Sequence, residues 1–365
     1  MKTATLILKD GTTLTGKSFG ALLNAAGEVV FNTSMVGYPE SLTDPSYTGQ
    51  ILVLTYPLIG NYGIGADTKD KDGIEKRFES KKAQITGLIV SQYCENFSHY
   101  DAKKSLGKWL KENKIPAITG IDTRSLTQKL RQHGTMLGKI AIDNKIDNKK
   151  EPDFYNPDLD NLVDKVSIKK PKIYKKGKKT IICVDCGMKN NIIRSFLQRG
   201  VTVIRVPWNY DFMNEKINGK KIKFDGIFMS NGPGDPSILT PLHNIIKRAF
   251  ALKKPIFGIC LGCQIMALAS GAKTYKLKFG HRSQNQPCMD TETKHCYITS
   301  QNHGFAIDEK TLKQGWKVWL RNTNDNTVEG IKHKNLPFFS CQFHPEATPG
   351  PLDTTHFFDE FVKML

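Results

Sequence analysis

Residues 255–269, PIFGICLGCQIMALA, predict a buried strand that turns sharply into a helix. The first residues form a short apolar run, and the later ones have apolar residues at helical spacing. At the junction, GICLG has the form Gly-x-nucleophile-x-Gly with Cys260 at its centre. Flanking glycines leave room for the strained turn that raises such a nucleophile above the edge of a sheet. A buried cysteine in an ordinary strand-to-helix crossover is the alternative interpretation.

Strand and helix patterns alternate over residues 179–365. TIICVD, VTVIRVP and FDGIFMS are strand-like, whereas NNIIRSFLQRG and LTPLHNIIKRAFALKK have helical spacing. The alternation predicts an α/β domain with a mostly parallel sheet and helices on both faces. Residues 1–150 are rich in strand formers and turn residues, and they predict a separate N-terminal α+β domain. The lysine-rich residues 151–178 are interpreted as a linker between the two domains.

The chain has a large basic excess, because 53 Lys and Arg residues outnumber 35 Asp and Glu residues and give a formal charge of +18. Much of it lies in KKPKIYKKGKKT, which no aromatic-interleaved nucleic-acid motif accompanies. We therefore expect a solvated linker and no nucleic-acid partner; a charged surface for an acidic partner subunit is the alternative. Apolar runs long enough for a signal peptide or a membrane span are missing. We expect no membrane partner and a cytoplasmic location, with the plastid stroma as the alternative.

Eight cysteines are scattered through the chain and are interpreted as free thiols. Two pairs have C-x-x-C spacing, Cys183 with Cys186 and Cys260 with Cys263. These pairs lie much further apart than the roughly 15–20 residues that separate the pairs of a zinc ribbon. We therefore expect no metal and no cofactor in this chain. Cys263 is interpreted as a packing residue one turn into the helix, although oxidation could still join it to Cys260.

A nucleophilic cysteine needs a base, and CQFHPEATPG, residues 341–350, offers one. His344 and Glu346 are two residues apart, so in an extended segment their side chains point the same way. Glu346 could fix the tautomer of His344 while the other ring nitrogen faces Cys260. A turn histidine before a proline is the alternative. The turn SNGPGDP, residues 230–236, follows a strand at the sheet edge where α/β proteins bind ligands, and is a candidate second oxyanion donor.

These three motifs, in this order, resemble those of the class I (triad) glutamine amidotransferases. The resemblance implies hydrolysis of L-glutamine to glutamate and ammonia through a glutamyl thioester. Cys260 would attack the amide, His344 would transfer the proton, and Glu346 would orient His344. The backbone amides of Gly232 and Leu261 would hold the oxyanion.

The first half resembles the N-terminal domain of the carbamoyl-phosphate synthase small-chain family, in FNTSMVGYPESLTDPSYTGQILVLTYPLIGNYGI and GIDTRSLTQKLRQHGTM. CGMKNNIIRS and ITSQNHGFAID match the same family. The resemblance implies a heterodimer, or a higher oligomer, with a large chain that uses ATP and Mg to make carbamoyl phosphate for arginine or pyrimidine biosynthesis. No P-loop motif occurs here, which agrees with nucleotide binding on the partner. Another class I amidotransferase subunit and a non-catalytic scaffold on the same fold are the alternatives.

The glutamine-binding positions of the family can be matched residue by residue. A substrate with an ammonium, a carboxylate and an amide needs several fixed polar groups and backbone dipoles. Ser46 comes from the first domain, so the resemblance places the pocket near the interdomain cleft. In FGHRSQNQPCMD, three residues depart from the family pattern and leave the local loop geometry and subunit contacts open: Ser283, Gln284 and Gln286. The matched glutamine-binding residues are Ser46, Gly232, Gly234, Leu261, Gln264, Asn302, Gly304 and Phe305.

Overall fold

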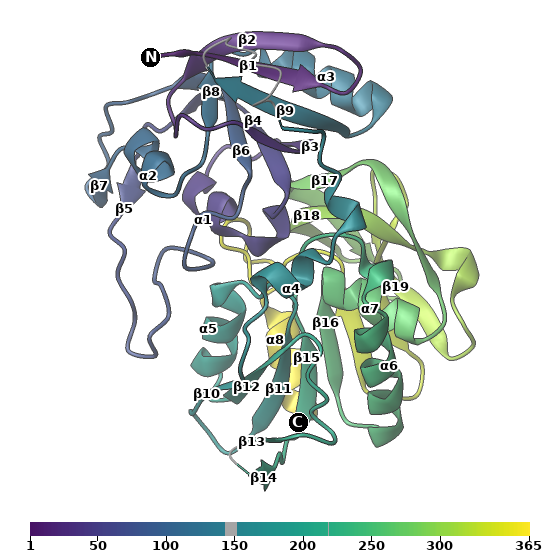
Figure 1. Cartoon of the computed structure of the whole chain (residues 1–365). Helices are drawn as coiled ribbons and strands as arrows, with labels where there is room; N and C mark the ends of the chain where they lie inside the picture. The colour runs from purple at the N-terminus through teal and green to yellow at the C-terminus, as the bar shows by residue number, and fades with distance from the viewer. Residues whose placement is uncertain (143–151, 218) are drawn as a thin grey trace. The chain divides into compact units, whose positions relative to one another are not determined.

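The computed structural model describes residues 1–142, 152–217 and 219–365 and divides into two compact units (Figure 1). The first unit is Met1–Asp160 and the second is Asn161–Leu365. The end of the predicted first domain and the start of the predicted linker, residues 143–151, lie outside the described residues. Within the described part of the chain, no helix is long and apolar enough to cross a membrane.

The first unit is built on a closed β-barrel whose neighbouring strands follow the order β1-β2-β8-β6-β4-β3-β9. Its core includes Val30, Leu52 and Leu88, all completely buried. The hairpin predicted at Asp10 and Gly11 joins β1 to β2, and Gly11 has a φ of 89° there. The elements are β1 (Thr3–Leu8), β2 (Thr13–Ser18), β3 (Ala25–Asn32), α1 (Tyr38–Thr43), β4 (Gln50–Ile59), β5 (Ile64–Gly65), β6 (Gly87–Tyr93), β7 (Ala102–Lys104), α2 (Leu106–Glu112), β8 (Ala117–Thr119), α3 (Thr123–His133) and β9 (Met136–Ile142).

The described part of the second unit contains a ten-stranded sheet in the order β10-β12-β11-β15-β16-β21-β20-β19-β17-β18. The strands from β12 to β21 in this order are parallel, and antiparallel strands extend the sheet at both ends. The predicted α/β class is confirmed, with a sheet more mixed than the mostly parallel one we expected. The strands are β10 (Lys172–Tyr174), β11 (Thr180–Asp185), β12 (Thr202–Pro207), β15 (Gly226–Met229), β16 (Ile256–Ile259), β17 (Lys273–Asp290), β18 (Cys296–Asp308), β19 (Trp316–Asn322), β20 (Val328–His333), β21 (Phe338–Cys341) and the separate pair β13 (Lys216–Ile217) and β14 (Lys220–Lys221).

Helices cover both faces of this sheet, as predicted (Figure 1). On β15, Phe228 packs edge-to-face against Phe196 of α5 and stacks with Phe358 of α8. Its neighbours Ile227 and Met229 belong instead to the core cluster that includes side chains of α6 and α7. Successive side chains of a strand point to opposite faces, so α5 and α8 lie on one face and α6 and α7 on the other. The helices are α5 (Asn190–Gln198), α6 (Thr240–Ala249), α7 (Leu261–Ala269) and α8 (His356–Met364).

The structure differs from the predicted linker 151–178, because residues 161–178 belong to the second unit. Helix α4 (Leu162–Val166) buries Leu162 and Val163, and Val163 joins the main core cluster. Strand β10 pairs antiparallel with β12 at the edge of the sheet. A few apolar residues are enough to anchor a short helix and an edge strand, and the many lysines around them masked that signal.

Candidate active site

Cys260 occupies the sharp turn between β16 and α7. Its backbone has φ 54° and ψ −106°, a conformation that non-glycine residues rarely adopt. Its N–H donates a hydrogen bond of 2.9 Å to the carbonyl of Cys341 at the end of β21. The flanking glycines are required by close packing, because a Cβ on Gly262 would lie 2.3 Å from the carbonyl oxygen of Met229. The local structure is therefore the nucleophile turn that the sequence predicted.

His344 and Glu346 follow β21 and form a buried pair. Nδ1 of His344 lies 2.6 Å from Oε1 of Glu346, and the two residues are only 2% and 1% exposed. The backbone N–H of His344 donates to the carbonyl of Ser300 on β18 at 2.9 Å, which fixes this segment to the sheet. Nε2 of His344 has no hydrogen-bond partner among the described residues. The imidazole also interacts electrostatically with Cys260. The three residues of the predicted triad are thus brought together.

The electrostatics of the pair favour two opposite charges. Burial alone would lower the pKa of His344, but the charge of Glu346 and the interaction with Cys260 raise that pKa to about 10. Burial likewise opposes ionisation of Glu346, but Lys189 and His344 lower its pKa to about 2. At neutral pH the pair is an imidazolium next to a carboxylate.

Lys189 is a fourth buried member of this group. It caps the start of α5, is 3% exposed, and places Nζ 3.1 Å from Oε1 of Glu346. Nζ also donates a hydrogen bond of 2.5 Å to the carbonyl of Ala347. A buried ammonium group is costly unless it is paired, so Lys189 and Glu346 stabilise each other's charged form.

The predicted oxyanion residues also lie next to each other. A Cβ added to Gly232 would lie 2.0 Å from the carbonyl oxygen of Cys186 and 2.8 Å from the side chain of Leu261. The turn that carries Gly232 is held by Ser230, whose Oγ accepts a hydrogen bond of 2.9 Å from the N–H of Cys186. Leu261 is the first residue of α7, and the first N–H groups of a helix have no partner within it. The two backbone segments that carry Gly232 and Leu261 are therefore in contact.

Several of the predicted glutamine-binding residues lie on α7 and β18, beside Cys260. The carbonyl oxygen of Asn302 lies 3.7 Å from Sγ of Cys260. Gln264 donates a hydrogen bond of 2.9 Å to the carbonyl of Phe305, two residues further along β18 than His303. Gly304 lies between His303 and Phe305 on β18. These contacts join α7 to β18 beside the nucleophile.

Two other predicted glutamine-binding residues, Gly234 and Ser46, have contacts within their own units. Gly234 has a φ of 85°. A Cβ added to Gly234 would lie 3.7 Å from the side chain of Leu162. Ser46 belongs to the first unit, in the short helix Pro45–Tyr47, where its N–H donates to Oδ1 of Asp44 at 2.9 Å. The part that Ser46 takes in glutamine binding stays a prediction.

A sequence profile described as "Glutamine amidotransferase class-I" matches residues 182–364, half of the chain. The chain belongs to the class I glutamine amidotransferase family. A second profile, "Carbamoyl-phosphate synthase small chain, CPSase domain", matches residues 6–140. Both parts of the predicted family resemblance are therefore confirmed.

Curated relatives of the chain are much longer than the chain itself. "Multifunctional protein URA2" of Saccharomyces cerevisiae is 50% identical over 98% of this chain and 17% of the relative. "Multifunctional protein CAD" of Squalus acanthias is 51% identical over 99% of this chain and 16% of the relative. The human "Carbamoyl-phosphate synthase [ammonia], mitochondrial" is 47% identical over the whole chain and 24% of the relative. The chain thus spans between about a sixth and a quarter of the length of these relatives.

The sequence analysis did not identify Lys189 as part of this site. The lysine stands in CGMKNN, which we had used only as a family motif. Its signal was a charged residue immediately before the apolar face of a predicted helix, but the pairing with Glu346 joins residues far apart in the sequence. Only the folded sheet brings them within reach.

The second cysteine of the nucleophile motif is a packing residue, as predicted. Cys263 is completely buried, and the hydroxyl of Ser340 lies 3.1 Å from its sulfur. Burial raises the pKa of its thiol to about 12. All eight cysteines, each within the described residues, are free thiols, which confirms that prediction.

The three departures from the family pattern lie on β17, which has an irregular register between Ser283 and Gln286. Gln286 donates a hydrogen bond of 3.0 Å to the hydroxyl of Ser283 and accepts one of 3.2 Å from Asn324. The substitutions of Ser283 and Gln286 therefore support each other within the bulge.

Proposed function

We propose that this chain is the glutaminase part of a glutamine-hydrolysing carbamoyl-phosphate synthase. In this proposal the chain hydrolyses L-glutamine and passes the ammonia to a large ATP-dependent chain, which makes carbamoyl phosphate from bicarbonate. The relatives include a synthase named for ammonia, so similarity alone does not decide whether glutamine is the substrate. The observation that carries the proposal is the buried His344–Glu346 pair, joined at 2.6 Å beside the Cys260 turn.

The first half-reaction forms a thioester. The Cys260 thiolate attacks the side-chain amide carbon of glutamine, and its electron pair forms the carbon–sulfur bond. The carbonyl oxygen becomes an oxyanion, which the N–H groups of Gly232 and Leu261 stabilise. His344 then gives its Nε2 proton to the leaving nitrogen. Ammonia departs and the glutamyl group stays on sulfur.

The second half-reaction returns the enzyme to its starting state. His344, now neutral, takes a proton from water, and the hydroxide attacks the thioester carbon. The carbon–sulfur bond breaks, glutamate leaves, and the thiolate again lies beside a protonated His344. Glu346 keeps the Nδ1 proton in place through both steps, so the other nitrogen always faces the sulfur. Lys189 keeps Glu346 ionised.

The partner and its cofactors follow from the same proposal. The chain itself would need no cofactor, and ATP and Mg would bind to the large chain in a heterodimer or a higher oligomer. The much greater length of the relatives supports a synthase partner that is either fused or separate. The product would serve arginine or pyrimidine biosynthesis, in the cytoplasm or the plastid stroma.

The test compares two nitrogen sources in the complex recovered from the source cell with this chain as bait. With glutamine, Cys260→Ser should lower carbamoyl phosphate formation by about 10³-fold or more, because the nucleophile is lost. With ammonium chloride, the variant should match the wild type, because the large chain does not need Cys260 for that substrate. Cys296→Ser, a change at an exposed cysteine, is the matched control. Equal glutamine-dependent rates in wild type and Cys260→Ser would refute the proposal.

A further inference from the structure

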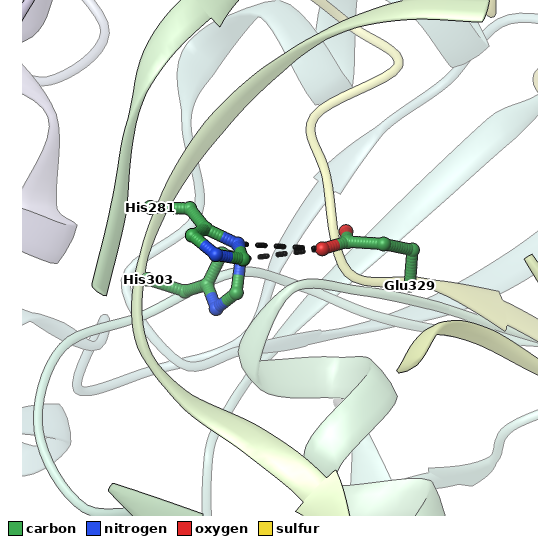
Figure 2. Close-up of side chains that lie close together, drawn as sticks. All are labelled: His281, His303 and Glu329. Carbon is green, nitrogen blue, oxygen red and sulfur yellow. Dashed lines mark ion pairs between the residues drawn. The ribbon is translucent and has the colours of Figure 1, made fainter. Parts of the chain in front are cut away.

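A second group of buried side chains with metal-binding chemistry lies on β17, β18 and β20 (Figure 2). His281, His303 and Glu329 each offer one ligand atom, and these atoms lie within 4.8 Å of one another. Nδ1 of His281 is 3.4 Å from Oε1 of Glu329, and Nε2 of His303 is 3.9 Å from the same oxygen. The three residues are 7%, 5% and 0% exposed. The proposed function assigns no role to this group.

Hydrogen bonds to the outer ring nitrogens fix both tautomers. Nε2 of His281 lies 2.8 Å from Oδ2 of Asp325, and a carboxylate oxygen only accepts, so Nε2 carries a proton. Nδ1 of His303 lies 2.8 Å from the backbone carbonyl oxygen of Phe305 and carries a proton for the same reason. In the neutral rings the lone pairs are then on Nδ1 of His281 and Nε2 of His303. Both of these atoms face Glu329.

An amide oxygen completes a ring of electron-pair donors. The side-chain nitrogen of Gln301 donates to Oε2 of Glu329 at 3.0 Å and to Oγ1 of Thr299 at 3.1 Å. Its amide oxygen therefore faces Nε2 of His303, at 3.2 Å. Nδ1 of His281 has no hydrogen-bond partner among the described residues. Two nitrogen lone pairs, a carboxylate oxygen and an amide oxygen thus converge, and they repel one another unless a cation or an extra proton lies between them.

We propose that His281, His303 and Glu329 bind a divalent transition-metal ion of the zinc class. Zinc takes imidazole and carboxylate ligands in tetrahedral geometry, with bonds of roughly 2.0–2.2 Å that place neighbouring ligand atoms about 3.3–3.5 Å apart. The observed 3.4 and 3.9 Å approach this spacing, so small side-chain rotations are enough. Magnesium and calcium prefer sites made of oxygen alone. Gln301 or a water molecule would supply the fourth ligand.

The outer hydrogen bonds match those of established metal sites. A histidine ligand usually donates its other N–H to a carboxylate or a backbone carbonyl, and a ligating carboxylate is itself hydrogen-bonded. The carboxylate of Asp325 accepts from His281, and the backbone carbonyl of Phe305 accepts from His303. The side-chain nitrogen of Gln301 donates to Glu329. The group therefore has both the ligands and their supports. The proposal departs from the expectation of no metal in this chain, which rested on cysteine spacing.

The metal site would fix the strand that lines the glutamine pocket. His303 lies on β18 between Asn302, whose carbonyl is near Cys260, and the segment whose Phe305 carbonyl accepts from Gln264. An ion that joins β17, β18 and β20 would hold these two carbonyls in place. Its role is structural, and no step of glutamine hydrolysis passes through it.

The test measures metal binding by the full chain. Titration with Zn²⁺ in the presence of a competing chelator gives the affinity, and the absorption spectrum of the protein with Co²⁺ gives the ligand geometry. We expect one ion per chain and the visible bands of tetrahedral Co²⁺. Asp325→Asn should weaken Zn²⁺ binding about 10–100-fold, as changes to the supports of metal ligands do, and Glu329→Gln should weaken it further. The side chain of Asp325 is 42% exposed, so Asp325→Asn carries the test even if Glu329→Gln fails to fold.

Two controls separate this site from others. His295→Gln changes an exposed histidine and should leave the affinity unchanged. Cys260→Ser removes the thiol beside His344, another place where strong zinc ligands lie close together, and should also leave the Zn²⁺ affinity unchanged. The proposal is overturned if the wild type binds no ion, or if Cys260→Ser abolishes binding while Asp325→Asn does not. A single shared proton would then occupy the group in place of a metal.

Discussion

The charge state of His344 is set by its neighbours and not by its ordinary chemistry. Glu346 holds one ring nitrogen at 2.6 Å, and Lys189 holds Glu346 at 3.1 Å. The first contact could be predicted from the sequence, because the two residues are two positions apart in FHPE. The second could not, because it joins the end of a loop before α5 to a segment after β21. The grouping of His281, His303 and Glu329 was not predictable for the same reason, since the pairing of distant strands brings these residues together.

The pH profile of glutamine hydrolysis tests these charges. His344, with a pKa raised to about 10, keeps its proton until the pH approaches that value. We therefore expect kcat/KM to fall as pH rises through about 10, because His344 can then no longer protonate the leaving nitrogen. In Glu346→Gln the carboxylate that raises this pKa is gone. The alkaline limb should move to lower pH, and the rate should fall by about 10²–10⁴-fold. An alkaline limb at the same pH in both proteins would contradict this assignment.

The pH dependence of the free energy of unfolding follows from the same two pKa shifts. The folded pKa of His344 lies above its usual value of 6.5, so its contribution is complete below pH 6.5 and is lost as pH rises through about 10. The folded pKa of Glu346 lies below its usual value of 4.5, so its contribution is complete above pH 4.5 and is lost as pH falls through about 2. Between these limits the pair stabilises the fold.

Individual elements were predictable where the signal was local. The turn at Cys260 follows from the glycines of GICLG, and the structure shows why they are needed, since Gly262 packs against the carbonyl of Met229. Helix α4 was not predicted, because its few apolar residues, Leu162, Val163 and Val166, lie in a stretch that was interpreted as a lysine-rich linker. The long strand β17 was not predicted, because its irregular register breaks the alternation of side chains.

Helix α4 provides the prediction at this scale. Leu162 is 2% exposed and is the residue nearest to Gly234, whereas Leu159 is 80% exposed. Leu162→Ala should lower the free energy of unfolding of the second unit by about 2–5 kcal/mol, because it leaves a cavity. Leu159→Ala, the matched control, should change it by less than about 0.5 kcal/mol. Chemical denaturation of both variants gives the measurement. Equal, small effects would mean that this segment is a linker, as the lysine-rich composition first indicated.

At the scale of the whole molecule, the order of the motifs proved more informative than any one of them. Alternating strands and helices predicted the second unit, and three motifs in a fixed order indicated its family. The barrel of the first unit was not predictable as a closed barrel, because closure depends on the pairing of β1 with β9 across most of that unit. Sequence patterns report the elements of such a unit, whereas long-range pairing decides how they close.

The central claim is that Cys260 carries the glutamyl group during turnover. The most direct measurement is mass spectrometry of the chain after brief mixing with L-glutamine and quenching in acid, which preserves thioesters. We expect a glutamyl adduct on the peptide that contains Cys260, present during turnover and absent once glutamine is exhausted. The same peptide also contains Cys263, so Cys263→Ala should retain the adduct and Cys260→Ser should lose it. Glutamine turnover without an adduct in the wild type, or an adduct that persists in Cys260→Ser, would contradict the account.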